Sequence, residues 1–91
     1  MTYQSTMTYQ DYLDHWDEDF GDTDTADYGY WRHGTHIDIV IQRLTEAEFN
    51  EHLKGLNDGF VEFDAAVKAN DDAAMGAAMA NSFPHELALL V

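Results

Sequence analysis

Carboxylates are the side chains of this 91-residue chain with the greatest capacity for chemistry. Eighteen Asp and Glu residues outnumber four Lys and Arg residues, and the formal net charge is −14. Between residues 11 and 27 there are eight acidic residues and no Lys or Arg. A surface of this charge repels nucleic acid and anionic membranes and attracts basic surfaces. We therefore expect a basic protein partner, no direct nucleic-acid binding and no membrane binding.

Motifs for catalysis are missing from the sequence. There is no cysteine, and Ser5 and Ser82 are the only serines. The chain has no G-x-S-x-G elbow, no Gly-rich phosphate loop and no H-E-x-x-H helix. We therefore expect no catalytic residue, no cofactor and no enzyme activity.

Two segments offer metal ligands, but neither matches a known pattern. His33, His36 and Asp38 provide three ligands for a zinc ion with one open position. DEDFGDTDTAD (17–27) is rich in Asp, but an EF-hand loop beginning at Asp17 places Asp22 where Gly is needed and, one residue after this segment, a tyrosine where Glu is needed. We expect surface residues at both segments and no metal site, with weak binding of divalent ions as the alternative.

The acidic run needs a helix to position it, and one is predicted from Thr8 onward. Thr8 and Asp11 have the spacing of an N-terminal capping box. Apolar residues then recur at helical intervals, at Tyr9, Tyr12, Leu13, Trp16 and Phe20. The tetrapeptide MTYQ also occurs at 1–4, where no apolar stripe follows. We therefore predict a flexible leader over 1–6, a single domain over 7–91, and Met7 as an alternative start.

A β-hairpin is predicted after the first helix. GDTDTADYG (21–29) has the composition of a loop. In YWRHGTHIDIVIQ (30–42), three isoleucines alternate with polar residues and one valine, which is the period of a half-buried strand. His33 and Gly34 form the predicted turn, and Tyr28, Tyr30 and Trp31 lie on the preceding strand.

A long second helix is the clearest prediction. Thr45 and Glu48 form a second capping box, and Leu44 and Phe49 occupy hydrophobic-staple positions. The stripe of apolar residues that follows keeps helical phase at Phe49, Leu53, Leu56, Phe60, Phe63 and Val67. Gly55 and Gly59 weaken the helix locally, but we predict one bent helix rather than two.

The C-terminal part is predicted as a third helix and an apolar tail. Asn70 is the expected cap, and the helix is expected to end near Asn81, before Pro84. Met75 and Met79 are expected in the core, with an adaptable contact surface or dimer interface as the alternative. The tail ELALLV forms either a strand or a short helix. The order α-β-β-α-α predicts an α+β fold, with a small antiparallel sheet packed against two or three helices. A C-terminal strand is the alternative for the tail.

The predicted helices place the carboxylates in two groups. At about 100° per residue, the acids of the first helix lie opposite its apolar stripe, and those of the second helix lie away from its phenylalanines. We define the first acidic patch as Asp11, Asp14, Glu18, Asp22, Asp24 and Asp27. We define the second acidic patch as Glu48, Glu51, Asp58 and Glu62. Tyr28, Tyr30 and Trp31 are candidate anchors beside the first patch; the alternatives are a solvated face and packing within the hairpin.

The chain resembles one class of proteins in its small size, its extreme acidity, and its lack of cysteine and of catalytic motifs. These are the small acidic inhibitors by which phages and mobile elements block nucleic-acid-binding host machinery: DNA mimics among the anti-CRISPR and anti-restriction proteins, and inhibitors of uracil-DNA glycosylase. The resemblance implies a stoichiometric inhibitor whose carboxylates occupy a Lys/Arg groove, and within the class we favour an anti-CRISPR that blocks target-DNA binding by an effector complex.

Such an inhibitor would act as a monomer in the cytoplasm of the host cell. The alternative function is a generic interaction module, such as an antitoxin or adaptor, that binds through the aromatic hairpin. Its charge would then serve only solubility.

Overall fold

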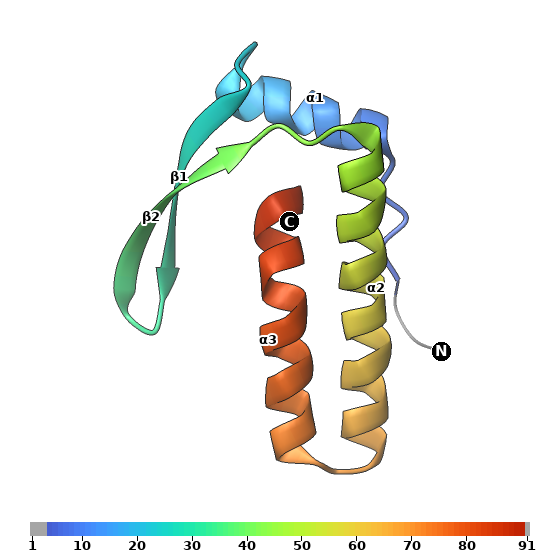
Figure 1. Ribbon diagram of the computed structural model, residues 1–91. Coiled ribbons are helices and arrows are strands. Elements are labelled where there is room, and N and C mark those ends of the chain that lie inside the picture. Colours follow the sequence, from blue (N-terminus) through green and yellow to red (C-terminus); the bar gives the residue numbers. More distant parts are fainter. Residues whose placement is uncertain (1–3, 91) are drawn as a thin grey trace.

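The computed structural model describes residues 4–90, and its element order confirms the predicted α+β fold. The elements are α1 (Tyr9–Phe20), β1 (Thr25–Arg32), β2 (Thr35–Gln42), α2 (Glu46–Lys68) and α3 (Asp72–Leu89). Figure 1 shows α2 and α3 side by side as a helical hairpin, α1 across the N-terminal end of α2, and the β-hairpin extending beside α3. The two strands pair antiparallel.

The predicted capping box at Thr8 is present and fixes the start of α1. The Thr8 hydroxyl accepts a hydrogen bond from the backbone N–H of Asp11 (3.1 Å), and the Asp11 carboxylate accepts one from the N–H of Thr8 (3.0 Å). The next turns place Tyr12 and Trp16 in the core, both fully buried. Opposite this face, the carboxylates of α1 are exposed.

The segment before α1 lies against α2. The backbone N–H of Ser5 donates to Oδ1 of Asn57 (2.7 Å), and the amide of Asn57 donates back to the carbonyl of Ser5 (3.3 Å). Residues 4–8 have no regular secondary structure. Of the leader predicted over 1–6, the first three residues lie outside the described part of the chain.

The β-hairpin begins earlier than predicted. The loop predicted over 21–29 is wrong from Thr25 onward, because Ala26 and Tyr28 pair with Ile41 and Ile39 in the ladder. Its Asp and Thr content suggested a loop, but pairing across the hairpin overrides composition. The turn is where it was predicted, and His33 and Gly34 both have positive φ (52° and 76°), as a two-residue hairpin turn requires.

Helix α2 is continuous through both glycines, as predicted. Side chains of α3 pack directly against both glycines. A Cβ built at Gly59 would lie only 2.6 Å from Cβ of Ser82, and a Cβ at Gly55 would overlap the ring of His85. The two residues that weaken α2 as an isolated helix therefore allow it to pack against α3.

Helix α3 corrects three predictions. Its N-cap is Asp71, whose carboxylate accepts from the N–H of Ala74, whereas Asn70 has left-handed backbone geometry (φ 54°). The helix does not end near Asn81 but continues through Pro84 to Leu89. The tail is therefore neither a strand nor a separate helix in the described residues. A proline inside a helix costs about 3 kcal/mol, and burial of Leu89 (1% exposed) helps to offset this cost.

The core lies where α1, the strand β2, the start of α2 and the end of α3 meet. It consists of seven buried residues: Tyr12, Trp16, Ile41, Leu44, Phe49, Leu56 and Leu89. The molecule measures 45 × 30 × 17 Å, so its thinnest dimension holds only two layers of elements. Much apolar surface of α2, α3 and the hairpin consequently remains partly exposed.

Within residues 4–90, none of the helices combines the length and apolar character that crossing a bilayer requires.

Candidate functional site

The α1 part of the first acidic patch is the most uniform group of charges. Asp11, Asp14 and Glu18 are all exposed. Among residues 4–90, no ion pair within 4.0 Å involves any of them. Hydrogen bonds from the backbone and side chain of Thr8 lower the pKa of Asp11, and the amide of Gln10 donates to Asp14 (2.9 Å). In the described part of the chain, this face therefore presents negative charge that no ion pair compensates.

The loop part of the first patch is less uniform, because Arg43 reaches into it. The Arg43 guanidinium lies 3.9 Å from the carboxylate of Asp17 and 3.8 Å from that of Asp22. The backbone N–H of Arg43 also donates to the carbonyl of Asp24 (2.8 Å). Asp27, predicted in a loop, lies instead on the outward face of β1. The charge here is only partly compensated, since one guanidinium serves two carboxylates.

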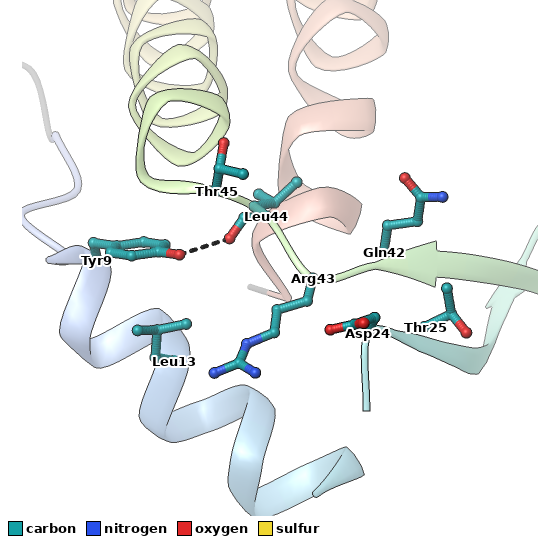
Figure 2. Close-up of a pocket in the computed structure, with 8 residues that line it drawn as sticks. All are labelled: Tyr9, Leu13, Asp24, Thr25, Gln42, Arg43, Leu44 and Thr45. Atoms are coloured by element: carbon teal, nitrogen blue, oxygen red, sulfur yellow. Dashed lines mark hydrogen bonds between the residues drawn. The ribbon is translucent and has the colours of Figure 1, made fainter. Parts of the chain in front are cut away.

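A shallow hollow separates the loop acids from the N-terminal end of α1. Its volume is about 390 Å³, and Arg43 and Asp24 lie at one side of it with Leu13 and Tyr9 at the other (Figure 2). The Tyr9 hydroxyl donates to the carbonyl of Leu44 (2.8 Å) and holds the segment before α2 against α1. The hollow is open and carries one guanidinium, so it suits contact with a partner better than enclosure of a small substrate.

The second acidic patch follows α2, and one of its members has a cationic partner. Lys54 donates to Asp58 (2.8 Å), and further along the helix Lys68 pairs with Asp64 (2.9 Å). Glu48 belongs to the second capping box, where hydrogen bonds from the backbone and side chain of Thr45 lower its pKa. Glu51 and Glu62 are exposed. This patch is consequently a weaker line of charge than the α1 face.

The acidic residues of α1 and α2 lie away from the contact between these two helices. Helices α1 and α2 meet through aromatic rings, with the centroid of Phe49 5.6 Å from that of Tyr9 and 5.7 Å from that of Tyr12. At about 100° per residue, the acids of each helix lie on the sides turned away from this contact.

The alternation of strand residues divides the three candidate aromatic anchors between the two faces of the hairpin. Tyr28 and Tyr30 are stacked (6.2 Å) on the face toward the helices, where Tyr30 also contacts Phe83 (5.6 Å). Trp31 points to the opposite face and is 73% exposed, with the ring of His36 beside it (5.3 Å). Of the three, Trp31 is the one available to a partner.

The possible metal ligands do not converge. His36 lies 3.6 Å from Asp38, but within residues 4–90 no group of three or more His, Cys, Asp or Glu side chains is arranged to hold a metal ion.

His52 and His85 form a close pair of titratable groups that was not predicted from the sequence. Nδ1 of His52 lies 3.0 Å from Nδ1 of His85, and both rings are partly buried between α2 and α3. Burial lowers the pKa of His52, His85 lowers it further, and Glu51 and Glu48 act in the opposite direction. The sequence prediction ended the third helix before His85. The one hint in the sequence is Gly55, a glycine within a predicted helix, which indicates a close neighbour; in the structure that neighbour is the His85 ring.

Comparison of the chain with known protein families, curated proteins and solved structures finds no match.

Proposed function

We propose that this protein is a stoichiometric inhibitor that acts as an acidic nucleic-acid mimic. In this proposal the α1 carboxylates enter the cationic groove of a host defence protein, and the protein is an anti-CRISPR that prevents an effector complex from binding target DNA. The observation that carries the proposal is the exposed α1 face, on which Asp11, Asp14 and Glu18 lack any ion pair within residues 4–90.

Spacing and electrostatics support this choice of face. At a rise of about 1.5 Å per residue, the three carboxylates repeat every ~4.5–6 Å along α1, on the order of phosphate spacing along a strand. Charges at the rim of an interface raise the association rate and fix the register of the partners. Near this patch, Arg43 pairs with Asp17 and Asp22, and His15 pairs with Asp19. Within residues 4–90, neither of them pairs with the three carboxylates of the exposed face.

The test reverses charge on α1 without disturbing its N-cap. Asp14→Lys with Glu18→Lys leaves the Asp11 capping box intact, and we expect the inhibitor concentration for half-maximal effect to rise at least ~10-fold, a loss of ~1.4 kcal/mol. The assay measures binding of labelled target duplex by a panel of purified CRISPR effector complexes in the presence of each variant.

The matched control changes the net charge by the same amount elsewhere. Asp38→Lys with Asp72→Lys alters two exposed residues outside both patches, and we expect near-normal inhibition. If both double variants lose potency equally, the effect is one of net charge and not of the α1 face. If no effector complex in the panel is inhibited by the unaltered protein, the proposal fails for those systems.

Exposure of Trp31 favours a second candidate, the generic interaction module such as an antitoxin or adaptor. A tryptophan that is 73% exposed is the kind of residue that dominates binding energy at protein interfaces. In this case Trp31→Ala would abolish capture of the partner, while the α1 reversal would leave it intact. Under the inhibitor proposal the inhibition assay should give the opposite order, with potency lost in the α1 reversal and retained in Trp31→Ala.

A further inference from the structure

The apolar stripe of α2 is longer than the part of the molecule that covers it. Phe49 and Leu56, in its first half, are 2% and 1% exposed, whereas Phe63 and Val67, in its second half, are 37% and 48% exposed. Figure 1 shows the cause: α1 crosses only the N-terminal end of α2, and the helical hairpin extends well beyond it. A stripe that keeps helical phase over its full length needs a cover over its full length.

Helix α3 adds to the same uncovered surface. Met79 is 61% exposed, and together with Phe60 and Phe63 it lines a hollow of about 200 Å³ between the two helices. We call Phe63, Val67 and Met79 the distal apolar face. A contiguous group of large apolar side chains is unusual on a surface that stays in water and marks an interaction site.

We propose that a second copy of this chain covers the distal apolar face, so that two α2–α3 hairpins pack against each other in a symmetric dimer. The proposal goes beyond the inhibitor function and does not depend on it. It departs from the monomer that we expected of such an inhibitor, and it favours the dimer interface at Met79 that the sequence left open as an alternative to core packing.

The surface area of the chain supports a partner of this size. A compact monomer of this mass exposes about 5,350 Å², whereas this chain exposes 6,100 Å². The excess of ~750 Å² is close to the ~800 Å² that each partner buries in a standard interface. The radius of gyration, 14.5 Å, likewise exceeds the ~12 Å of a compact chain of this length.

The distribution of charge favours a second copy over a cationic partner at this face. Of the described residues that line the hollow, Glu86 is the only charged one, and at about 100° per residue the acids of the second acidic patch lie away from the distal apolar face around α2. A cationic helix docked here would therefore find little charge to pair with. Two copies of a −14 protein repel one another, but salt near 0.15 M screens charges more than about 8 Å apart.

The experiment is sedimentation velocity of the full chain over a dilution series from the micromolar to the millimolar range. We expect a concentration-dependent species of twice the chain mass of 10.3 kDa. Met79→Glu should weaken the dimer at least ~10-fold, and this variant should fold because Met79 is already mostly exposed. Val61→Glu is the matched control, since Val61 is 45% exposed but, at about 100° per residue, lies on a different side of α2.

The outcomes are separable from those of the inhibition assay. The proposal is overturned if the unaltered chain sediments as a monomer throughout, or if Met79→Glu and Val61→Glu have the same effect. Added salt should strengthen the dimer, because it screens repulsion between like charges, and should weaken binding to a basic target. Circular dichroism of each variant verifies that the fold is retained.

Discussion

Asp11 and Glu48 each combine a structural role with their place in an acidic patch. Each carboxylate accepts the N–H of its N-cap residue, at 3.0 Å in both helices, and these bonds lower the pKa of both groups. Substituting either residue would therefore disturb a helix start as well as the surface charge. Asp14 and Glu18 carry charge without this role, which makes them the informative positions for testing function.

The His52–His85 pair is the second feature at the scale of single residues. The two Nδ1 atoms lie 3.0 Å apart. In a hydrogen bond between them one Nδ1 donates and the other accepts, so only one of these two atoms carries a proton. A proton added to His52 would place a positive charge in this partly buried contact. The contact between α2 and α3 should thus respond to pH.

We expect the free energy of unfolding to decrease as the pH falls below neutrality. Burial lowers the pKa of His52 in the folded chain from its ordinary value of 6.5, so the unfolded chain binds this proton more readily. The effect is absent well above pH 6.5, where His52 is neutral in both states. It grows as the pH falls through 6.5 and is complete below the folded pKa. Urea denaturation at a series of pH values measures it.

The control for this prediction separates His52 from the other histidines. His52→Gln keeps a hydrogen-bonding side chain that does not titrate, so the decrease over this pH range should become smaller. His33→Asn changes an exposed histidine with φ 52°, a geometry that Asn tolerates, and should retain the decrease of the unaltered protein. Equal pH dependence in all three proteins would exclude the pair as its source.

At the scale of elements, the helical hairpin depends on small residues at the contact between α2 and α3. Gly59 faces Ser82, and Ala66 and Ala78 are buried nearby along the two helices (5% and 2% exposed). Small side chains let two helix backbones approach closely and bury more of their length. Helix propensity alone would disfavour Gly at both 55 and 59, so packing decides these positions.

Two Gly→Ala substitutions should have opposite effects on stability. Gly59→Ala adds a Cβ that would lie 2.6 Å from Cβ of Ser82, and we expect a loss of about 1–3 kcal/mol from overpacking. Gly76→Ala lies in α3 with nothing within 4 Å of the added Cβ, and we expect a gain of about 0.5–1 kcal/mol from helix propensity. Urea denaturation of both variants tests this contrast, and stabilisation by both would show that α2 and α3 lie further apart.

At the scale of the whole molecule, the chain has a net charge of −14 but only a small core, which in the described residues 4–90 consists of seven buried side chains. Self-repulsion disfavours the compact state, while three Lys and Arg residues are engaged in ion pairs with nearby acids: Arg43, Lys54 and Lys68. The thin fold and the high charge together predict low stability at low ionic strength, a property that a cationic partner would correct.

We expect the melting temperature to rise with salt. Raising the ionic strength from ~0.01 M to ~0.15 M shortens the screening length from about 30 to about 8 Å, and a gain of ~1 kcal/mol would raise the melting temperature by ~4–8 °C. Thermal unfolding at low protein concentration measures this change without a contribution from self-association.

Charge reversal supplies the control for the salt effect. Asp14→Lys with Glu18→Lys changes the charge by two at each site, so −14 becomes −10, and the rise with salt should be smaller. A melting temperature that falls with salt would mean that the ion pairs of Lys54 and Lys68 outweigh the repulsion. This variant should also be more stable than the parent at low salt.

Features set by neighbours in the chain were predicted well from the sequence. Both capping boxes, the His33–Gly34 turn and the continuous α2 depend on residues no more than about four positions apart, or on a period that repeats along one element. The exposure of the acids follows from the same periodicity.

Features that depend on contacts between distant segments were decided only by the tertiary structure. Packing of the last turn on the core carries α3 through Pro84, and strand pairing begins β1 at Thr25. The strand period separates Trp31 from Tyr28, but only the fold shows which face is left open. The periodicity predicts that Phe63 and Val67 belong to the core, yet they are 37% and 48% exposed because α1 reaches only the first half of α2. Local pattern determines what each element is, whereas burial depends on which elements meet, and that is a property of the whole chain.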